Sequence, residues 1–234
     1  MTLADDRWEV AASGDLATYA ERWRAHLDRW LAARFAAVAP VADGLALVAV
    51  GGYGYGRLAP GSDLDLLLLH RGRTAPTEVA DALWYPIWDE GLALGHAVRS
   101  RRETLELAED DLDTATALLS CRHLAGDAAL TAGLAEAAVE RWRRRGPAVL
   151  DRLDASCRDR WARDGEVAFL LEPDLKAGRG GLRDLDALRW AEAARPLVER
   201  ADVASLRAAE ATLGQARTAL HAAQWLLLKM DPYG

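Results

Sequence analysis

The stretch LALVAVGGYGYGRLAPGSDLDLLLLH, from Leu45 to His70, decides the fold of this chain. Its two apolar runs, 45–50 and 64–69, predict strands that are buried on both faces. Between them lies a glycine-rich turn, and Asp63 and Asp65 stand where the second strand begins. Side chains two residues apart on a strand share a face, so we expect both carboxylates to project together, with Cα atoms ~6–7 Å apart.

Two neighbouring carboxylates after a flexible loop are typical of a Mg²⁺ site, because this ion prefers carboxylate oxygens together with phosphate oxygens. Without a cation, their mutual repulsion would raise the cost of burying them. The spacing excludes two other glycine-loop motifs. A dinucleotide fingerprint would need a third glycine where Arg57 stands, and no Gly-Lys-Ser/Thr sequence of a P-loop follows. A hairpin with a glycine-rich turn and two solvated aspartates remains the alternative.

The sequence GGYGYGRLAPGSDLDLLLL resembles the signature of the polymerase-β-like nucleotidyltransferases. Within that superfamily it is most similar to the N-terminal catalytic domain of bacterial protein-PII uridylyltransferases. The resemblance implies that Asp63 and Asp65 bind two Mg²⁺ ions. It also implies that Gly51, Gly52 and Ser62 contact the β- and γ-phosphates of a nucleoside triphosphate.

A second motif lies between Leu171 and Leu185, where LEPDLK is followed by GRGGLRDL. It resembles the block after the nucleotidyltransferase domain of uridylyltransferases and, in related form, of glutamine synthetase adenylyltransferase. Its glycines allow tight turns or close approach of a phosphate. Its cations suit triphosphate recognition, and we expect Lys176 and Arg183 to help neutralise the leaving pyrophosphate. The alternative is a turn between helices with a surface pair of Arg183 and Asp184.

The third predicted strand, 92–99, carries Gly95-His96 and no acid. Many polymerase-β-like enzymes have a third carboxylate on this strand, whereas the uridylyltransferase pattern has Gly-His. His96 is either a contact to a phosphate or carboxylate, or a structural histidine. The third metal ligand is therefore unassigned. Its candidates are Asp89, Glu90, Glu172 and Asp174.

We predict an α+β fold in two domains. Residues 1–100 are expected to form a small mixed-sheet nucleotidyltransferase domain of polymerase-β-like type, with an N-terminal helix over 16–38 and a covering helix over 77–88. Residues 101–234 are expected to form a helical domain that carries the second motif, with a helix from Asp110 to about Leu124. The further helices expected are 128–145, 149–163, 184–195 and 203–228.

The composition favours a cytoplasmic protein. Its 234 residues contain no apolar run near twenty and begin with the acidic MTLADDRWEV, so neither a transmembrane helix nor a signal peptide is expected. Cys121 and Cys157 are too few for a disulfide scaffold, and both fall on helical patterns, where we expect them to be inert. The net charge of −7 disfavours nucleic-acid binding, so we interpret the basic run 141–145 as a solvated helix face.

The resemblance implies Mg²⁺-dependent transfer from UTP, or from another NTP, to a tyrosine of the PII nitrogen-regulatory protein. In that family an HD domain removes the uridylyl group and two ACT domains sense glutamine. The sequence contains no His-Asp pair, so we expect neither property of this chain, whether it is a fragment or naturally short. Two other hypotheses remain: a protein adenylyltransferase, and a non-catalytic remnant that binds a nucleotide or a partner.

Overall fold

The computed structural model divides the chain into two compact units. One consists of Met1–Ala138 together with Thr218–Gly234, and the other of Val139–Arg217. This division differs from the predicted one, in which the second domain begins at residue 101. None of the described helices is long and apolar enough to span a membrane. The structure describes residues 3–12, 15–41, 43–72, 75–196 and 200–230.

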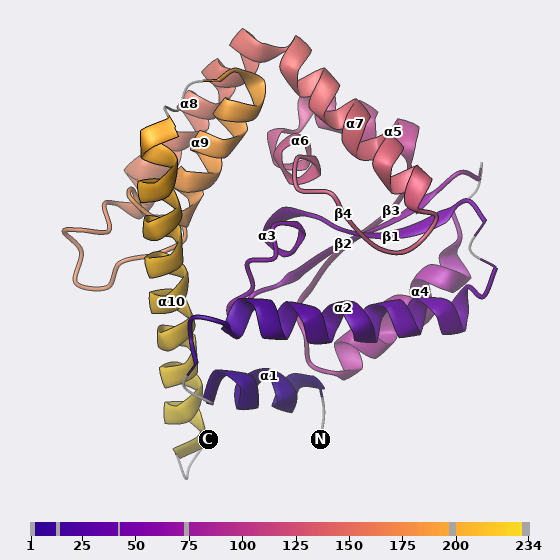
Figure 1. The fold of residues 1–234 in the computed structure, drawn as a ribbon, viewed down its shortest axis with the longest axis horizontal. Helices are drawn as coiled ribbons and strands as arrows, with labels where there is room; N and C mark the ends of the chain where they lie inside the picture. The colour runs from indigo at the N-terminus through magenta and orange to yellow at the C-terminus, as the bar shows by residue number, and fades with distance from the viewer. Residues whose placement is uncertain (1–2, 13–14, 42, 73–74, 197–199, 231–234) are drawn as a thin grey trace. The chain divides into compact units, whose positions relative to one another are not determined.

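A four-stranded mixed sheet forms the centre of the first unit (Figure 1). Its strands are β1 (Leu45–Ala49), β2 (Leu64–His70), β3 (Leu94–Ser100) and β4 (Arg122–Gly126), in the spatial order β3-β2-β1-β4. Strand β1 is antiparallel to both β2 and β4, while β2 and β3 are parallel. The two predicted strands of the opening stretch are confirmed, and they occupy the middle of the sheet.

Helices cover both faces of this sheet, as the continuous apolar runs of β1 and β2 require. On one face, α2 (Tyr19–Val38) and α4 (Thr77–Asp89) pack against alternate residues of the central strands, among them Leu47 and Leu68. Helix α2 buries a stripe at helical spacing that includes Trp23. It begins only at Tyr19, because residues 16–18 form a turn.

The other face is covered by three helices that follow the third strand. They are α5 (Arg101–Asp110), α6 (Leu112–Leu118) and the first part of α7 (Ala128–Arg144). Their apolar side chains pack on the remaining alternate residues of β1 and β2, including Val48 and Leu67. Two short elements were not predicted, namely α1 (Leu3–Ala12) and the single turn α3 (Gly51–Gly54), which directly follows β1.

The second unit is helical. It contains the end of α7, α8 (Gly146–Asp164), a loop, α9 (Leu182–Ala194) and the first part of α10 (Arg200–Met230). Helices α8 and α9 pack together. The indole Nε1 of Trp142 donates a hydrogen bond to the carbonyl of Trp190 over 2.8 Å. The predicted helices of this region are confirmed to within three residues at each end.

The predicted helix from Asp110 to Leu124 is wrong. Helix α6 ends at Leu118, and residues 122–126 form β4 at the edge of the sheet beside β1. Cys121 therefore lies just before a strand and not on a helix, and burial raises the pKa of its thiol to about 12. An edge strand needs no apolar alternation, and the sequence RHLAG has none, so the helical pattern on either side obscured it.

Gly126 offers a test of this strand assignment. Its φ is +88°, and a Cβ atom at this position would lie 2.3 Å from the Leu45 carbonyl oxygen. We expect Gly126→Ala to lower the free energy of unfolding by about 1–3 kcal/mol. The control is Gly214→Ala inside α10, where an added Cβ atom would meet no described atom within 4 Å beyond its chain neighbours and the nearby helix backbone. Alanine should stabilise the helix there by about 0.5–1 kcal/mol. Equal stability of both variants in urea unfolding would contradict the assignment.

Candidate active site

The two aspartates lie at the start of β2, as predicted. Asp63 directly precedes the strand and is exposed, whereas Asp65 is its second residue and is half-buried. Asp65 alternates with Leu67 and Leu69, which belong to the core beneath α5, α6 and α7. Asp63 lies one residue before β2, so its place on the same face stays a prediction.

Two glycines enclose the carboxylate of Asp65. A Cβ atom on Gly51 would lie 2.8 Å from Asp65 Oδ2, and one on Gly95 would lie 2.5 Å from Asp65 Oδ1. Gly51 also has a φ of +58°, which L side chains rarely adopt. Any other residue at either position would displace the carboxylate. Gly95 was not among the predicted site residues, although the Gly-His pair on the third strand was its signal.

The short helix α3 that carries the Gly51-Gly52 pair is held by Arg122 of β4. The guanidinium donates to the carbonyls of Gly54 (Nε, 3.3 Å) and Tyr53 (Nη2, 3.2 Å). It also forms a two-point ion pair with Asp28 of α2, at 2.7 and 3.1 Å. Tyr53 donates its hydroxyl to the same carboxylate over 2.7 Å. The sequence pattern indicates no role for Asp28, and it predicts that Arg122 lies on a helix.

Burial and the acceptor at Asp28 both raise the pKa of Tyr53. The phenol therefore remains a neutral donor and locks the side chain of Tyr53 in place. A second close contact fixes the end of α3, because a Cβ atom on Gly54 would lie 2.3 Å from the Ser120 carbonyl oxygen. Together these contacts hold the turn beside Asp65. None of them involves Gly52, which is exposed.

Ser62 stabilises the loop that leads into Asp63. Its hydroxyl accepts a hydrogen bond from the Ala59 amide over 2.9 Å, and its own amide donates to the Ala59 carbonyl over 2.9 Å. The predicted contact of Ser62 with a phosphate remains a prediction. What the structure adds is that the same hydroxyl shapes the loop.

The candidates for a third metal ligand are divided between the units, with Asp89 and Glu90 in the first and Glu172 and Asp174 in the second. Glu90 accepts a hydrogen bond from the Leu3 amide, and Asp174 accepts two from the amides of Lys176 (2.7 Å) and Ala177 (2.9 Å). Among the residues that the structure describes, no three His, Cys, Asp or Glu side chains gather as a metal site. The metal site at Asp63 and Asp65 therefore remains a prediction, and its third ligand stays unassigned.

His96 belongs to an aromatic cluster. Its ring centroid lies 5.5 Å from that of Trp84 and 5.4 Å from that of Trp88. Its neighbour Gly95 faces Asp65, and alternation directs His96 to the opposite face of the sheet. The packing supports the structural interpretation of this histidine.

In the second unit, the second motif is organised by Asp184. One carboxylate oxygen accepts from Arg160 and from Trp161 Nε1 (2.9 Å), and the other accepts from the Gly180 amide over 2.7 Å. Burial alone would raise the pKa of Asp184, but these donors outweigh it and hold the pKa below its ordinary value. The suggested surface pair of Arg183 and Asp184 does not form, since the partner of Asp184 is Arg160.

The glycines of the motif serve close packing of the backbone. A Cβ atom on Gly181 would lie 2.7 Å from the Leu175 carbonyl oxygen, and one on Gly178 would lie 2.8 Å from that of Asp174. A backbone hydrogen bond connects the two predicted phosphate ligands, because the Arg183 amide donates to the Lys176 carbonyl over 2.9 Å. Arg179 instead stacks over Trp161 at 5.1 Å.

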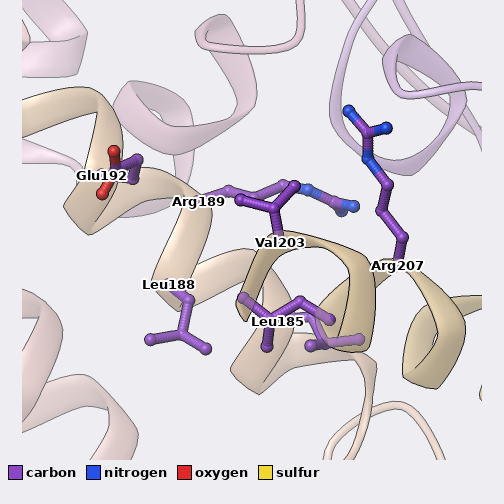
Figure 2. A pocket seen from close by; sticks show the side chains of 7 residues that line it. Leu185, Leu188, Arg189, Glu192, Val203 and Arg207 are labelled. Atoms are coloured by element: carbon purple, nitrogen blue, oxygen red, sulfur yellow. The ribbon is translucent and has the colours of Figure 1, made fainter. Parts of the chain in front are cut away.

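Helices α9 and α10 of the second unit border a pocket of about 260 Å³ (Figure 2). Its lining is largely apolar, with Leu185, Leu188 and Val203 beside Arg189 and Arg207. The Arg189 guanidinium donates to Glu210 (Nη1 to Oε1, 2.7 Å), which joins the two helices. The sequence analysis singled out none of these side chains, and none belongs to the aspartate site.

Comparisons with known proteins agree with this geometry. The family model described as GlnD PII-uridylyltransferase matches residues 149–225. A bifunctional uridylyltransferase/uridylyl-removing enzyme of Streptomyces coelicolor is 50% identical over 201 residues, which cover 79% of this chain and 24% of that protein. Its namesake in Mycobacterium tuberculosis is 43% identical over 192 residues, which cover 77% of this chain and 23% of that protein.

The small mixed sheet with a glycine turn beside an aspartate pair, followed by helices, is the architecture of a nucleotidyltransferase domain with a helical part. The matches relate the chain further to the bacterial protein-PII uridylyltransferases. It spans about a quarter of the length of the curated relatives it matches.

The hydrogen bonds of Asp184 predict a pH-dependent stability. Its pKa is lowered on folding, so its contribution is complete above the unfolded value of about 3.9 and is lost as the pH falls through the folded value. At pH 7 we expect Asp184→Asn to lower the free energy of unfolding by about 1–2 kcal/mol, because three donors lose a charged acceptor that keeps some exposure. Below about pH 4 the gap to the wild type should shrink.

Urea unfolding at pH 7, 5, 4 and 3.5 measures this gap. Asp151→Asn is the control, since Asp151 is exposed on α8. A gap that is absent at pH 7, or that widens toward pH 3.5, would refute the role given to Asp184.

Proposed function

We propose that this chain catalyses Mg²⁺-dependent transfer of UMP from UTP to a tyrosine of a PII-type signalling protein. One observation carries the proposal: the carboxylate of Asp65, two residues after Asp63, is enclosed by Gly51 and Gly95. The two glycines leave room for the Asp65 carboxylate itself, whose oxygens are the kind of ligand that Mg²⁺ prefers. The name of the relatives supplies the uridylyl group, and the description of the matching family model supplies PII as the acceptor.

The donor set fits Mg²⁺, because the aspartates offer hard oxygen ligands and leave positions for phosphate. Bound there, Mg²⁺ ions would lower the pKa of the attacking hydroxyl and stabilise the charge on the entering and leaving oxygens. Asp63 and Asp65 are the residues that would hold these ions. The turn at Gly51-Gly52 brings backbone close to the site, where an amide can donate to a phosphate.

The second motif supports the proposal through its cations. A backbone hydrogen bond joins Lys176 of the loop to Arg183 at the start of α9, and Lys176 is exposed. We assign them to the triphosphate, where each charge-assisted hydrogen bond would stabilise the leaving pyrophosphate. The acceptor tyrosine has an ordinary pKa near 10, so its deprotonation requires the assistance of the metal site.

The proposal is tested by incubating the chain with Mg²⁺, a PII protein and each labelled NTP in turn. Transfer from UTP alone is the expected result. Transfer from ATP alone would identify a protein adenylyltransferase instead. Saturable NTP binding without transfer would identify a non-catalytic remnant.

We expect Asp63→Asn and Asp65→Asn each to abolish transfer while the melting temperature is unchanged or raised. The physical reason is that either substitution removes a metal ligand and also relieves repulsion between the carboxylates. The measurement is initial rate beside thermal unfolding. Asp81→Asn on the exposed face of α4 is the control. Near-normal turnover of both variants would show that the chemistry lies elsewhere.

Lys176→Ala and Arg183→Ala should each raise the dissociation constant of a non-hydrolysable Mg-NTP at least tenfold, because a charge-assisted hydrogen bond to phosphate contributes roughly 1.5–3 kcal/mol. The melting temperature should change little. Calorimetric titration and thermal unfolding measure both quantities, with Arg195→Ala, an exposed cation of the same unit, as the control. Unchanged affinity with a lowered melting temperature would make the motif a structural brace.

A further inference from the structure

The second half of α10 belongs to the first unit and packs on it through one face. Thr218 is buried, Ala222 packs against the main core, and the Trp225 indole stacks on Trp8 of α1 with a centroid distance of 5.2 Å. These positions recur at helical spacing, i, i+4 and i+7. Figure 1 shows this half of α10 passing beside α1.

His221 lies on the same face of α10 and reaches the loop before the aspartates. Its Nδ1 accepts a hydrogen bond from the Gly61 amide over 2.9 Å. A Cβ atom on Gly61 would lie 2.8 Å from this nitrogen, so a glycine is what lets the imidazole approach. The acceptor role requires the tautomer whose proton is on Nε2.

This hydrogen bond acts on a loop that is otherwise held by its neighbours along the chain and in the sheet. Ala59 and Ser62 bond to each other, and the Leu64 amide donates to the Ala93 carbonyl over 2.9 Å. Gly61 stands two residues before Asp63. The hydrogen bond therefore connects His221 of α10 to the loop just before Asp63, the candidate metal ligand. The two bonded residues are 160 positions apart in the sequence.

We propose that His221 is a positioning residue for the nucleotidyl-transfer site: by accepting the Gly61 amide it fixes the loop that presents Asp63. The inference rests on the proposed function and adds α10 to the site. Without the acceptor, the Gly61 amide would exchange its partner for water and the loop would sample other conformations. Asp63 would then be less well placed as a ligand, because a ligand must be held by its surroundings to bind well.

The test compares His221→Ala with His221→Asn, whose Oδ1 is an acceptor at a position similar to that of Nδ1. Gln224→Ala, on the exposed side of the same helix, is the control. The first readout is hydrogen exchange of the Gly61 amide in the full 234-residue chain without nucleotide or metal. The second is the Mg²⁺ concentration that gives half-maximal transfer, measured beside turnover at saturating Mg²⁺.

In His221→Ala we expect faster exchange at Gly61 and a three- to tenfold higher Mg²⁺ requirement, about the effect of one hydrogen bond. His221→Asn should restore both values, and Gln224→Ala should change neither. An unchanged Mg²⁺ requirement in His221→Ala, beside normal wild-type transfer, would overturn the positioning role alone. Equal exchange at Gly61 in all variants would overturn the contact itself. No transfer by the wild type from any NTP would overturn the proposed function and the positioning role with it.

Discussion

The two-point ion pair between Arg122 and Asp28 is the constraint on which the candidate site depends. It connects an edge strand, a long helix and, through the carbonyls of Tyr53 and Gly54, the single turn that follows β1. A one-turn helix has too few internal hydrogen bonds to be stable alone. The Arg122 guanidinium supplies the additional hydrogen bonds, because this planar group can donate to a carboxylate and to carbonyls at once.

The position of this turn decides what Asp65 can do. Gly51 contacts the carboxylate from one side and Gly95 from the other, so the glycines come from the turn and from the parallel strand β3. Neither glycine contributes a side chain to the chemistry. Their contribution is space beside an oxygen ligand, which would disappear if the turn moved by the width of a methyl group.

Much of the candidate site could be predicted from the opening stretch alone, because apolar runs, glycines and paired acids are local signals. Asp63, Asp65 and Gly51 lie where the pattern indicated. Arg122 could not be found in this way, because its partner Asp28 is 94 positions away and β4 carries no apolar alternation. A register shift between β1 and β4 at Leu47 and Val48 further weakens any pattern there.

The second motif also contains a contact that could not be predicted from the local sequence. Arg183 and Asp184 are adjacent in the sequence, but consecutive residues of a helix do not face each other. Asp184 therefore turns to Arg160, which is on the preceding helix. Sequence proximity suggested a pair that helical geometry disfavours, whereas the roles of Gly178 and Gly181 in tight packing followed from residue type alone.

The first unit is discontinuous, since Val139–Arg217 is inserted between its two parts, and this has a consequence for biosynthesis. On the ribosome the sheet and its covering helices emerge first, yet Trp8 meets Trp225 only after the inserted unit has been made. Until then a nascent chain exposes the surface that α10 will cover, and chaperones recognise such apolar surface. The inserted helices contact mainly their neighbours in the sequence, so they are free to fold during the delay.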